Sequence, residues 1–566
     1  MRGIGNQQQQ EEEEEEGVAL VQVVDDGCNN KTKKQPQPQP PDNDDDESAI
    51  ANNKTAAEHV GWSTWTSGGL SSAVKMRMPG RVGLAVGGLI LLALLLAFAT
   101  TCTTTVDFAA ISSFLPFGGG GQQQSGRPQR SSSRVLPIPL LCANDTATKC
   151  PRAGASAAPA PAPSDQQQQQ QAVVECPSYF RYIERDLSPW ASSGITREAV
   201  ERGRRQAHFR LVVVDGRAYV ETYKHAFQTR DVFTQWGIVQ LLKRYPGRVP
   251  DLDLMFNCED MPEVRAASYP DRSAAPPLFR YCKDPSTLDV LFPDWSFWGW
   301  PEVNVRPWAP LLAEMAHENA RLPWADREPY AYWKGNPYVS QVRRDLLRCN
   351  DSHAAVVYIQ DWGFANRNGF RDSNLAQQCR HRYKIYVQGR SWSVSRKYIL
   401  ACDSPVLALA TQYQDFFSRG LLPAQHYWPI DPDPNHMCRD IRFAVLWGNA
   451  HPAQAQKMGR AGSGFTRDDM AMDLVYDYML HVLTRYASLL RYKPSVPERA
   501  VELCPESMAC PQRGRNRDFM MQSREEFVAD YDPCIMPTPP LTDDDATNMA
   551  HREADVLAKI HTMKST

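Results

Sequence analysis

The chain has 566 residues and a formal net charge of −3 at pH 7, and aromatic residues make up 10% of it. That aromatic content supplies too much buriable apolar surface for a wholly disordered protein. The near-neutral charge gives no general electrostatic attraction to a polyanion, so we do not expect nucleic acid to be a partner.

Residues 1–81 form a polar tail of low sequence complexity. It contains the homopolymeric runs Gln7–Gln10 and Glu11–Glu16 and the acidic run Asp42–Glu47. A segment of this composition buries too little apolar surface to offset the entropy lost on ordering. We therefore expect residues 1–81 to be disordered.

An uncharged apolar segment follows at residues 82–100, which read VGLAVGGLILLALLLAFAT. As a helix it would be about 28 Å long, close to the thickness of a bilayer core. A long polar tail precedes it, so we expect an uncleaved anchor instead of a signal peptide; a buried core helix is the alternative. Lys75, Arg77 and Arg81 lie on its N-terminal side, which predicts a type II protein with the tail in the cytosol and the remainder in a lumen. The short span favours the Golgi membrane, with the endoplasmic reticulum as the alternative.

Residues 101–172 resemble a spacer, because they contain a Gly run, an Ala/Pro run and a Gln run. Twelve of the 14 cysteines lie between Cys142 and Cys534. An even number of cysteines in an oxidising lumen favours disulfide bonds. The lumenal sequons at Asn144 and Asn350 are candidate glycosylation sites.

Residues 173–510 have the composition of a folded head, in which we expect two lobes with a boundary near 310–330. We expect residues 511–566 to be a partly ordered tail. Apolar runs predict strands at 209–214, 218–220, 252–257, 330–334, 354–359, 383–387 and 405–410. Helical patterns occur at 229–245, 308–318, 340–349, 394–402 and 468–492. Such alternation predicts an α/β fold with parallel, doubly wound sheets and a ligand cleft at the C-terminal strand ends.

Three clusters in the head could carry chemistry. Asp260 follows the strand at 252–257, where α/β folds place reactive groups; taken alone, it is explained at least as well by an Asx turn or a helix cap. Lys334, Gly335 and Asn336 form a turn that leads into a helix, which suits a phosphate site or a plain surface turn. Ser395 and Arg396 begin another helix, where a guanidinium and helix amides together favour a diphosphate. A further aromatic stretch, which is either core or a surface on which a sugar stacks, contains Trp295, Ser296, Phe297 and Trp298.

Taken together, these motifs resemble the Rumi-type protein O-glucosyltransferases and their capsule-associated-protein relatives, and most closely the membrane-anchored plant branch. The resemblance spans about residues 176–490. Its motifs are Cys176-Pro177-x-Tyr179, Asp186-Leu187-x-Pro189-Trp190, Asp260-Met261-Pro262, Asp294-Trp295-Ser296-Phe297-Trp298-Gly299-Trp300-Pro301, Trp333-Lys334-Gly335, Tyr383-Lys384-x-Tyr386-x-x-Gly389, Ser395-Arg396, Phe416-Phe417, His426-Tyr427-x-Pro429-Ile430 and Gly459-x-x-Gly462-Ser463.

The resemblance implies a GT-B architecture, in which two Rossmann-like lobes enclose a nucleotide-sugar cleft. It implies an inverting glycosyltransferase that moves glucose or xylose from UDP-glucose or UDP-xylose to a hydroxyl of a protein or polysaccharide acceptor. Asp260 would be the general base, although Met261 replaces the usual aromatic residue, and Arg396 would contact the donor phosphates. The family's second phosphate-contacting arginine falls on Lys334, Arg343 or Arg344, of which we favour Arg344.

The resemblance also implies a disulfide bond between Cys379 and Cys402, and we expect a second between Cys258 and Cys282. No metal or other cofactor is expected. The sequence Asp251-Leu252-Asp253 matches a metal-binding Asp-x-Asp motif, but it precedes a strand instead of following one. An inactive glycan-binding or scaffold protein on the same fold is the alternative function.

Overall fold

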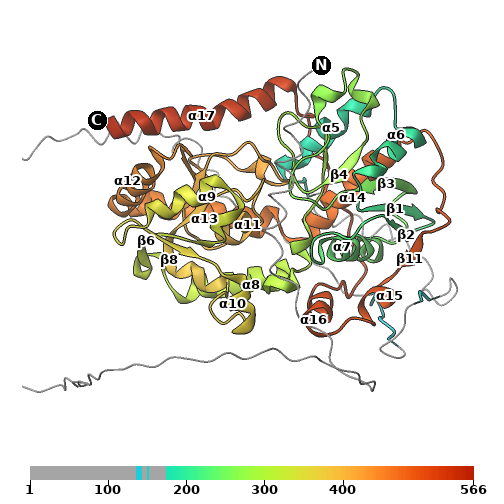
Figure 1. Cartoon of the computed structure of the whole chain (residues 1–566), viewed down its shortest axis with the longest axis horizontal. Helices are drawn as coiled ribbons and strands as arrows, with labels where there is room; N and C mark the ends of the chain where they lie inside the picture. The colour runs from blue at the N-terminus through green and yellow to red at the C-terminus, as the bar shows by residue number, and fades with distance from the viewer. Residues whose placement is uncertain (1–135, 143–148, 152–173, 566) are drawn as a thin grey trace, which may run out of the picture. The chain divides into compact units, whose positions relative to one another are not determined.

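The computed structural model describes residues 136–142, 149–151 and 174–565 (Figure 1). The predicted tail at 1–81, the predicted membrane span at 82–100 and the sequon at Asn144 lie outside these residues. Within the described part of the chain, no helix is both long enough and apolar enough to cross a bilayer.

The first lobe is built on a six-stranded mixed sheet with the order β11-β2-β1-β3-β4-β5. An Asp215-Gly216 turn with positive φ at both residues joins β1 to β2, the strands predicted at 209–214 and 218–220. A turn this tight forces its strands to be antiparallel, and β1 is also antiparallel to β3, whereas β3, β4 and β5 are parallel. The expectation of parallel sheets therefore holds for only half of this sheet. The bounds are β1 Phe209–Val214, β2 Arg217–Thr222, β3 Leu252–Phe256, β4 Leu278–Arg280, β5 Val290–Leu291 and β11 Val501–Leu503.

The second lobe is built on a five-stranded sheet with the order β10-β9-β8-β6-β7, and all of its strand pairs are parallel. Its core face presents Ala331, Trp333 and Ile385 toward Ile441 and Val445 of helix α12. This sheet has the Rossmann-like character that strand-helix alternation predicts. The bounds are β6 Glu328–Gly335, β7 Ala355–Ile359, β8 His381–Tyr386, β9 Val406–Leu409 and β10 Trp428–Ile430.

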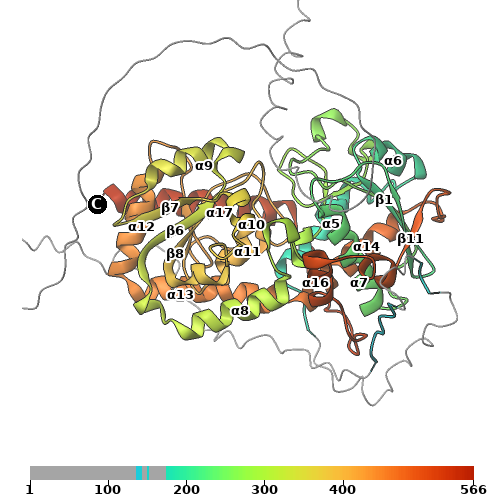
Figure 2. The ribbon, with the colours of Figure 1, turned by 60° about the horizontal axis from the view of Figure 1, so that its bottom comes forward.

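Helices cover both sheets (Figures 1 and 2). Those of the first lobe and of the link between lobes are α5 Tyr182–Leu187, α6 Arg197–Arg202, α7 Arg230–Arg244 and α8 Trp308–Arg321. Those of the second lobe are α9 Gln341–Leu346, α10 Trp362–Arg367, α11 Ser395–Leu400, α12 Met437–Ala450 and α13 Pro452–Gly464. The C-terminal ones are α14 Met472–Leu489, α15 Pro505–Ala509, α16 Gly514–Gln522 and α17 Asp543–Ser565.

The C-terminal part of the chain returns to both lobes. Helix α14 packs on the first lobe, where the Tyr486 hydroxyl donates to the backbone oxygen of Asp253 at 2.9 Å. Helix α17 then runs along the second lobe, with Val556 and Ile560 buried in that lobe's core (Figures 1 and 2). The segment after residue 510, which we expected to be a partly ordered tail, also reaches both lobes: α16 buries Phe519 and Met520 and is followed by Ser523, which accepts from Trp236 of the first lobe, and α17 packs on the second.

Five disulfide bonds account for ten of the twelve cysteines that follow residue 141. Two of them tie the predicted spacer to the head, because Cys142 pairs with Cys510 and Cys150 pairs with Cys504. The predicted Cys379–Cys402 bond is confirmed. The other two are Cys176–Cys534 and Cys349–Cys438. Such a set of disulfides indicates that this part of the chain folds in an oxidising compartment.

The predicted Cys258–Cys282 bond is wrong, because both thiols are free and buried. Strands β3 and β4 pair with Phe256 opposite Phe279, a register that places Cys258 level with Tyr281. Side chains alternate between the faces of a strand, so Cys282 projects to the other side. There its Sγ contacts the backbone oxygen of Asp260 at 3.1 Å.

The sequon residue Asn350 is exposed at the end of a short helical turn. Its Oδ1 accepts a hydrogen bond from the backbone N–H of Val357 at 3.0 Å, which fixes the side chain without covering it. Glycosylation at this position stays a prediction.

Candidate active site

The two lobes meet where the C-terminal ends of their parallel strands face each other. After β4 and β9, Lys283 and Gln414 exchange two backbone hydrogen bonds of 3.0 and 2.9 Å. Nearby, the Ser391 hydroxyl donates to the backbone oxygen of Asp260 at 2.6 Å. The loops of both lobes therefore form one continuous seam, in the position where α/β folds bind their ligands.

Asp260 lies on this seam, shortly after β3, with its carboxylate 30% exposed. Its Oδ1 accepts a hydrogen bond of 2.7 Å from Nη1 of Arg230, the first residue of α7. Arg230 is buried and its guanidinium lies 4.5 Å above the ring of Trp295. A guanidinium partner is not the backbone amide that an Asx turn or a helix cap would supply. The carboxylate of Asp260 is thus partly exposed at the lobe junction and is oriented by its hydrogen bond from Arg230.

Arg343 and Arg344 are neighbours in α9, but their side chains lie in different surroundings. Arg343 turns toward the seam, where it donates to the backbone oxygens of Gln388 and Asn336 at 2.7 and 3.1 Å. Burial lowers the pKa of Arg343 to about 10, although Tyr386 and Asp260 act in the opposite direction. Arg344 is exposed and bonds to Gln341 of its own helix. Of the two arginines, Arg343 is therefore the one that lies at the seam, although neither lines the cavity described below.

The turn before α9 supplies less to the seam than the sequence suggests. Lys334 Nζ donates to the backbone oxygen of Asp372 at 2.7 Å on an exposed surface. Asn336 caps the next helical turn, because its Oδ1 accepts from the N–H of Tyr338 at 2.9 Å. Gly335 lies against Trp333, whose ring would be 2.5 Å from an added Cβ. Lys334 and Asn336 thus have structural roles here, and the glycine is needed for packing.

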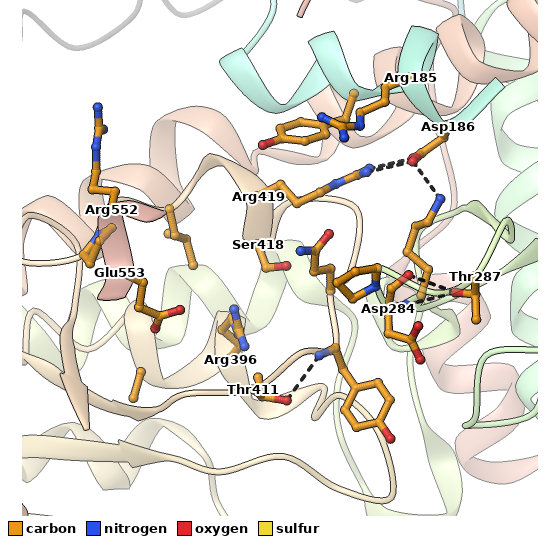
Figure 3. Close-up of a pocket in the computed structure, with 18 of the residues that line it drawn as sticks. Arg185, Asp186, Asp284, Thr287, Arg396, Thr411, Ser418, Arg419, Arg552 and Glu553 are labelled. Atoms are coloured by element: carbon orange, nitrogen blue, oxygen red, sulfur yellow. Dashed lines mark hydrogen bonds and ion pairs between the residues drawn. The ribbon is translucent and has the colours of Figure 1, made fainter. Parts of the chain in front are cut away.

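Arg396 lies in the wall of a cavity of about 580 Å³ between the lobes (Figure 3). Its guanidinium sits 4.0 Å from the ring centroid of Tyr386. The Arg396 Nε is buried and has no hydrogen-bond partner among the described residues. Ser395, the first residue of α11, does not line the cavity; its Oγ lies 2.9 Å from that of Ser393 in the preceding loop.

The cavity favours an anionic ligand. Its basic side chains outnumber its acidic ones; they are Arg185, Arg272, Lys283, Arg396, Arg419 and Arg552 against Asp186, Asp284 and Glu553. A cavity lined with this excess of cations, and with the buried Arg396 Nε unpaired among the described residues, suits a diphosphate. The volume suits a ligand of nucleotide size.

A buried ion-pair cluster closes one side of the cavity and links the lobes (Figure 3). The two oxygens of Asp186 accept from Arg419 at 2.8 and 2.7 Å, and Lys283 donates to the same carboxylate at 3.0 Å. Burial alone would raise the pKa of Asp186, but Arg419 and Lys283 outweigh it and hold that pKa below its ordinary value. Arg419 and Lys283 were missed by sequence reasoning, because neither belongs to a motif and only the fold brings them together.

Cavity and Asp260 are joined by the loop between β8 and α11. The ring of Tyr386, at the end of β8, packs against the guanidinium of Arg396. Ser391 donates a hydrogen bond to the backbone oxygen of Asp260, and Ser393 Oγ accepts one of 3.2 Å from Arg343. One short segment therefore contacts three predicted functional residues. Asp260 itself is not part of the cavity wall.

The aromatic stretch from Trp295 to Trp298 is core. The four side chains are at most 1% exposed. Ser296 Oγ accepts a hydrogen bond of 2.7 Å from the buried Lys397 Nζ, and Trp298 Nε1 donates to the Tyr476 hydroxyl at 3.0 Å. Of the two interpretations of this stretch, sugar stacking is therefore wrong for this conformation, and Trp295 acts as the surface beneath Arg230.

The two carboxylates of the Asp251-Leu252-Asp253 motif bind protein groups away from the cavity. Asp253 is completely buried in β3 and accepts from Arg210 at 2.7 and 2.6 Å. Asp251 accepts from the N–H of Asp215 at 2.9 Å. Their ion-pair and turn contacts explain both carboxylates without a cation, and neither carboxylate lines the cavity.

Comparison with known proteins agrees with the family resemblance that the motifs indicate. Residues 171–564 match the model described as glycosyl transferase family 90. O-glucosyltransferase rumi of Drosophila melanogaster is 25% identical over 352 residues, which cover 59% of this chain and 82% of the relative. Protein O-glucosyltransferase 1 of Homo sapiens is 25% identical over 335 residues, which cover 56% of this chain and 81% of the relative.

Proposed function

Since the chain belongs to glycosyl transferase family 90, it is a glycosyltransferase, and we propose that it moves glucose or xylose from a UDP-sugar to a hydroxyl of a protein acceptor. The observation that carries the donor part is the cationic cavity with the unpaired buried Nε of Arg396. The names of the relatives motivate the choice of glucose and of a protein acceptor. A polysaccharide acceptor and a xylose donor are the alternatives that the experiment below separates.

The donor diphosphate would bind in the cavity between the lobes, in a GT-B arrangement. Arg396 is held on Tyr386 and Arg343 on the backbone of Gln388, so both cations are fixed before a ligand arrives. Positive groups that need no reorganisation are the most effective stabilisers of the charge that develops on a leaving group. These two arginines would thus bind UDP-sugar and stabilise departing UDP.

Asp260 would act as the general base on the acceptor side. It would take the proton from the acceptor hydroxyl while that oxygen attacks the anomeric carbon from the face opposite UDP. The bond between the anomeric carbon and the UDP oxygen breaks, its electron pair leaves with UDP, and the configuration inverts. Arg230 would fix the direction of the carboxylate through the 2.7 Å bond described above. General-base assistance of this kind contributes roughly 10²–10⁴-fold to the rate.

We infer that no metal ion takes part. Arg396 and Arg343 supply positive charge near the cavity, and the Asp-x-Asp carboxylates are occupied by Arg210 and a backbone amide. In such an enzyme, guanidinium groups replace the divalent cation that otherwise bridges the two phosphates.

We place the enzyme in the secretory pathway, with its head in the lumen. The disulfide bonds require an oxidising compartment. The finer proposal is a single-pass type II protein of the Golgi membrane that is anchored by residues 82–100, with the endoplasmic reticulum as the alternative. Protease added to sealed vesicles should remove the N-terminal tail and leave the head intact; digestion of the head would contradict this orientation.

A UDP-release assay on the purified full-length chain tests the proposed function. UDP-glucose and UDP-xylose would be offered in turn, each with a folded protein acceptor or with a polysaccharide, and the product would be identified by mass spectrometry. Acceptor-dependent UDP release with a new glycosidic mass on the protein supports the proposal. UDP binding without release from any donor and acceptor pair would favour the inactive glycan-binding or scaffold protein instead.

A further inference from the structure

Helix α17 forms part of the cavity wall, although it lies in the segment that the sequence suggested was a polar tail. Thr547, Arg552 and Glu553 of this helix line the cavity, and Figure 3 shows the last two. One and two turns further on, Val556 and Ile560 are each 2% exposed and anchor the helix in the core of the second lobe. The position of Glu553 relative to the cavity is therefore set by packing.

Glu553 is one of three acidic residues in a wall that is cationic as a whole; of the other two, Asp186 pairs with Arg419 and Lys283, and Asp284 accepts from the N–H of Ser286 at 2.8 Å. The Oε1 of Glu553 accepts a hydrogen bond of 3.2 Å from the Tyr427 hydroxyl. Burial raises the pKa of the Glu553 carboxyl, although Arg396 and Tyr427 act in the opposite direction. A carboxylate offers about four acceptor positions and no donor. A ligand group that meets Glu553 must therefore donate hydrogen bonds, which phosphate oxygens cannot do.

The order of the groups along the site indicates which part of the ligand this is. Asp260 marks the place where the sugar reacts, and Arg396 marks the diphosphate. Asp260 is next to Cys282, on the side of the cavity that Lys283 and Asp284 form. Figure 3 shows Glu553 and Arg552 on the opposite side of Arg396 from Asp284 and Thr287. A donor that runs from Asp260 past Arg396 thus brings its nucleoside end to Glu553.

We propose that Glu553 binds the ribose hydroxyls of the donor nucleotide, so that α17 forms part of the donor site. This proposal rests on the proposed function. A vicinal diol presents two donors at a spacing that matches the two oxygens of one carboxylate, a pairing that dinucleotide-binding folds also use. Tyr427 orients the carboxylate by its hydrogen bond. This assignment gives the Glu553 carboxylate a role in a cavity whose excess of basic residues otherwise favours anions.

The experiment compares the binding of uridine diphosphate and 2′-deoxyuridine diphosphate by calorimetry, with the full-length chain in detergent. The two ligands share base and diphosphate and differ by one ribose hydroxyl. The wild-type chain should prefer uridine diphosphate by about tenfold, the worth of one charge-assisted hydrogen bond. In Glu553→Ala and Glu553→Gln the preference should shrink to within about twofold, with weaker binding of uridine diphosphate and little change for the deoxy ligand. Tyr427→Phe should reduce the preference partially.

Asp555→Asn is the matched control, because it removes the same charge from an exposed position of the same helix outside the cavity wall. It should keep the full preference, and near-UV circular dichroism should show that all variants are folded. A wild-type chain that binds neither diphosphate would contradict the proposed function itself. Equal binding of the two ligands by the wild type, a preference that survives in Glu553→Ala, or tighter binding of uridine diphosphate by Glu553→Gln would each overturn the role of Glu553 while leaving the donor cavity in place.

Discussion

Replacing Asp260 by Asn separates chemistry from structure more cleanly than any other single change. Asn keeps an oxygen that can accept the 2.7 Å hydrogen bond from Arg230, but it cannot take a proton from the acceptor. The loss of general-base help should lower kcat by roughly 10²–10⁴-fold, or about 3–5 kcal/mol in activation free energy. Arg230 is buried, but the amide oxygen of Asn can still accept from it, so losing the charge of the partly exposed carboxylate should cost only about 1–2 kcal/mol of stability.

The assay measures kcat, the KM for UDP-sugar and the melting temperature of Asp260→Asn. We expect a collapse of kcat with a donor KM and a melting temperature close to those of the wild type, because the carboxylate acts on the acceptor. Glu259→Gln is a matched control, since Glu259 is the adjacent carboxylate but is 54% exposed and pairs with His208. An Asp260→Asn enzyme with wild-type turnover would refute the general-base assignment, and so would an equal loss in Glu259→Gln.

Four further outcomes are expected. Arg343→Ala should weaken UDP binding, measured by titration calorimetry, by about tenfold or more, whereas Arg344→Ala, at an exposed residue, should not. The reverse result would identify Arg344 as the phosphate-contacting arginine. EDTA should leave most transferase activity intact, and abolition of transfer that Mn²⁺ restores would establish a metal-dependent enzyme. Asp186→Asn should destabilise the fold by about 3–5 kcal/mol near pH 7, because it leaves Arg419 and Lys283 without their carboxylate. Since the folded-state pKa of Asp186 lies below its ordinary value of 3.8, this contribution is complete above that pH and fades as the pH falls further, so melting curves of mutant and wild type should converge in acid. Cys379→Ser should cost roughly 3 kcal/mol by opening a loop with a sequence separation of 23, to be checked by denaturant unfolding.

The strands and helices of the head were predictable wherever a local pattern determines them. The Asp215-Gly216 turn specifies a hairpin, and the observed β1 and β2 flank it. The parallel sheet of the second lobe follows from regular strand-helix alternation. The first sheet could not be predicted as mixed, because the pairing of β1 with β3 and of β11 with β2 depends on contacts between distant segments.

For the site residues, the sequence motifs do not specify which side chains face the seam or the cavity. Successive residues of a helix point about 100° apart, so the choice between Arg343 and Arg344 depends on the rotation of α9, which motif spacing does not specify. The aromatic stretch at Trp295 has the composition of a sugar-binding surface, but its place beneath α7 buries it. Glu553 was missed because α17 is largely polar, and its few buried residues gain their meaning only from the lobe on which it packs.

The geometry of the seam suggests how one loop can coordinate two steps of transfer. The loop between β8 and α11 carries Arg396 at its end and, through Ser391, holds the backbone of Asp260 in the other lobe. Asp186 with Arg419 makes a second buried link across the same junction. If Arg396 binds the donor and Asp260 is the base, as we propose, donor binding would act on the segment that holds the backbone of Asp260. In such an arrangement, an acceptor hydroxyl meets a fully assembled site only when the donor is already present, which limits wasteful hydrolysis of the UDP-sugar by water.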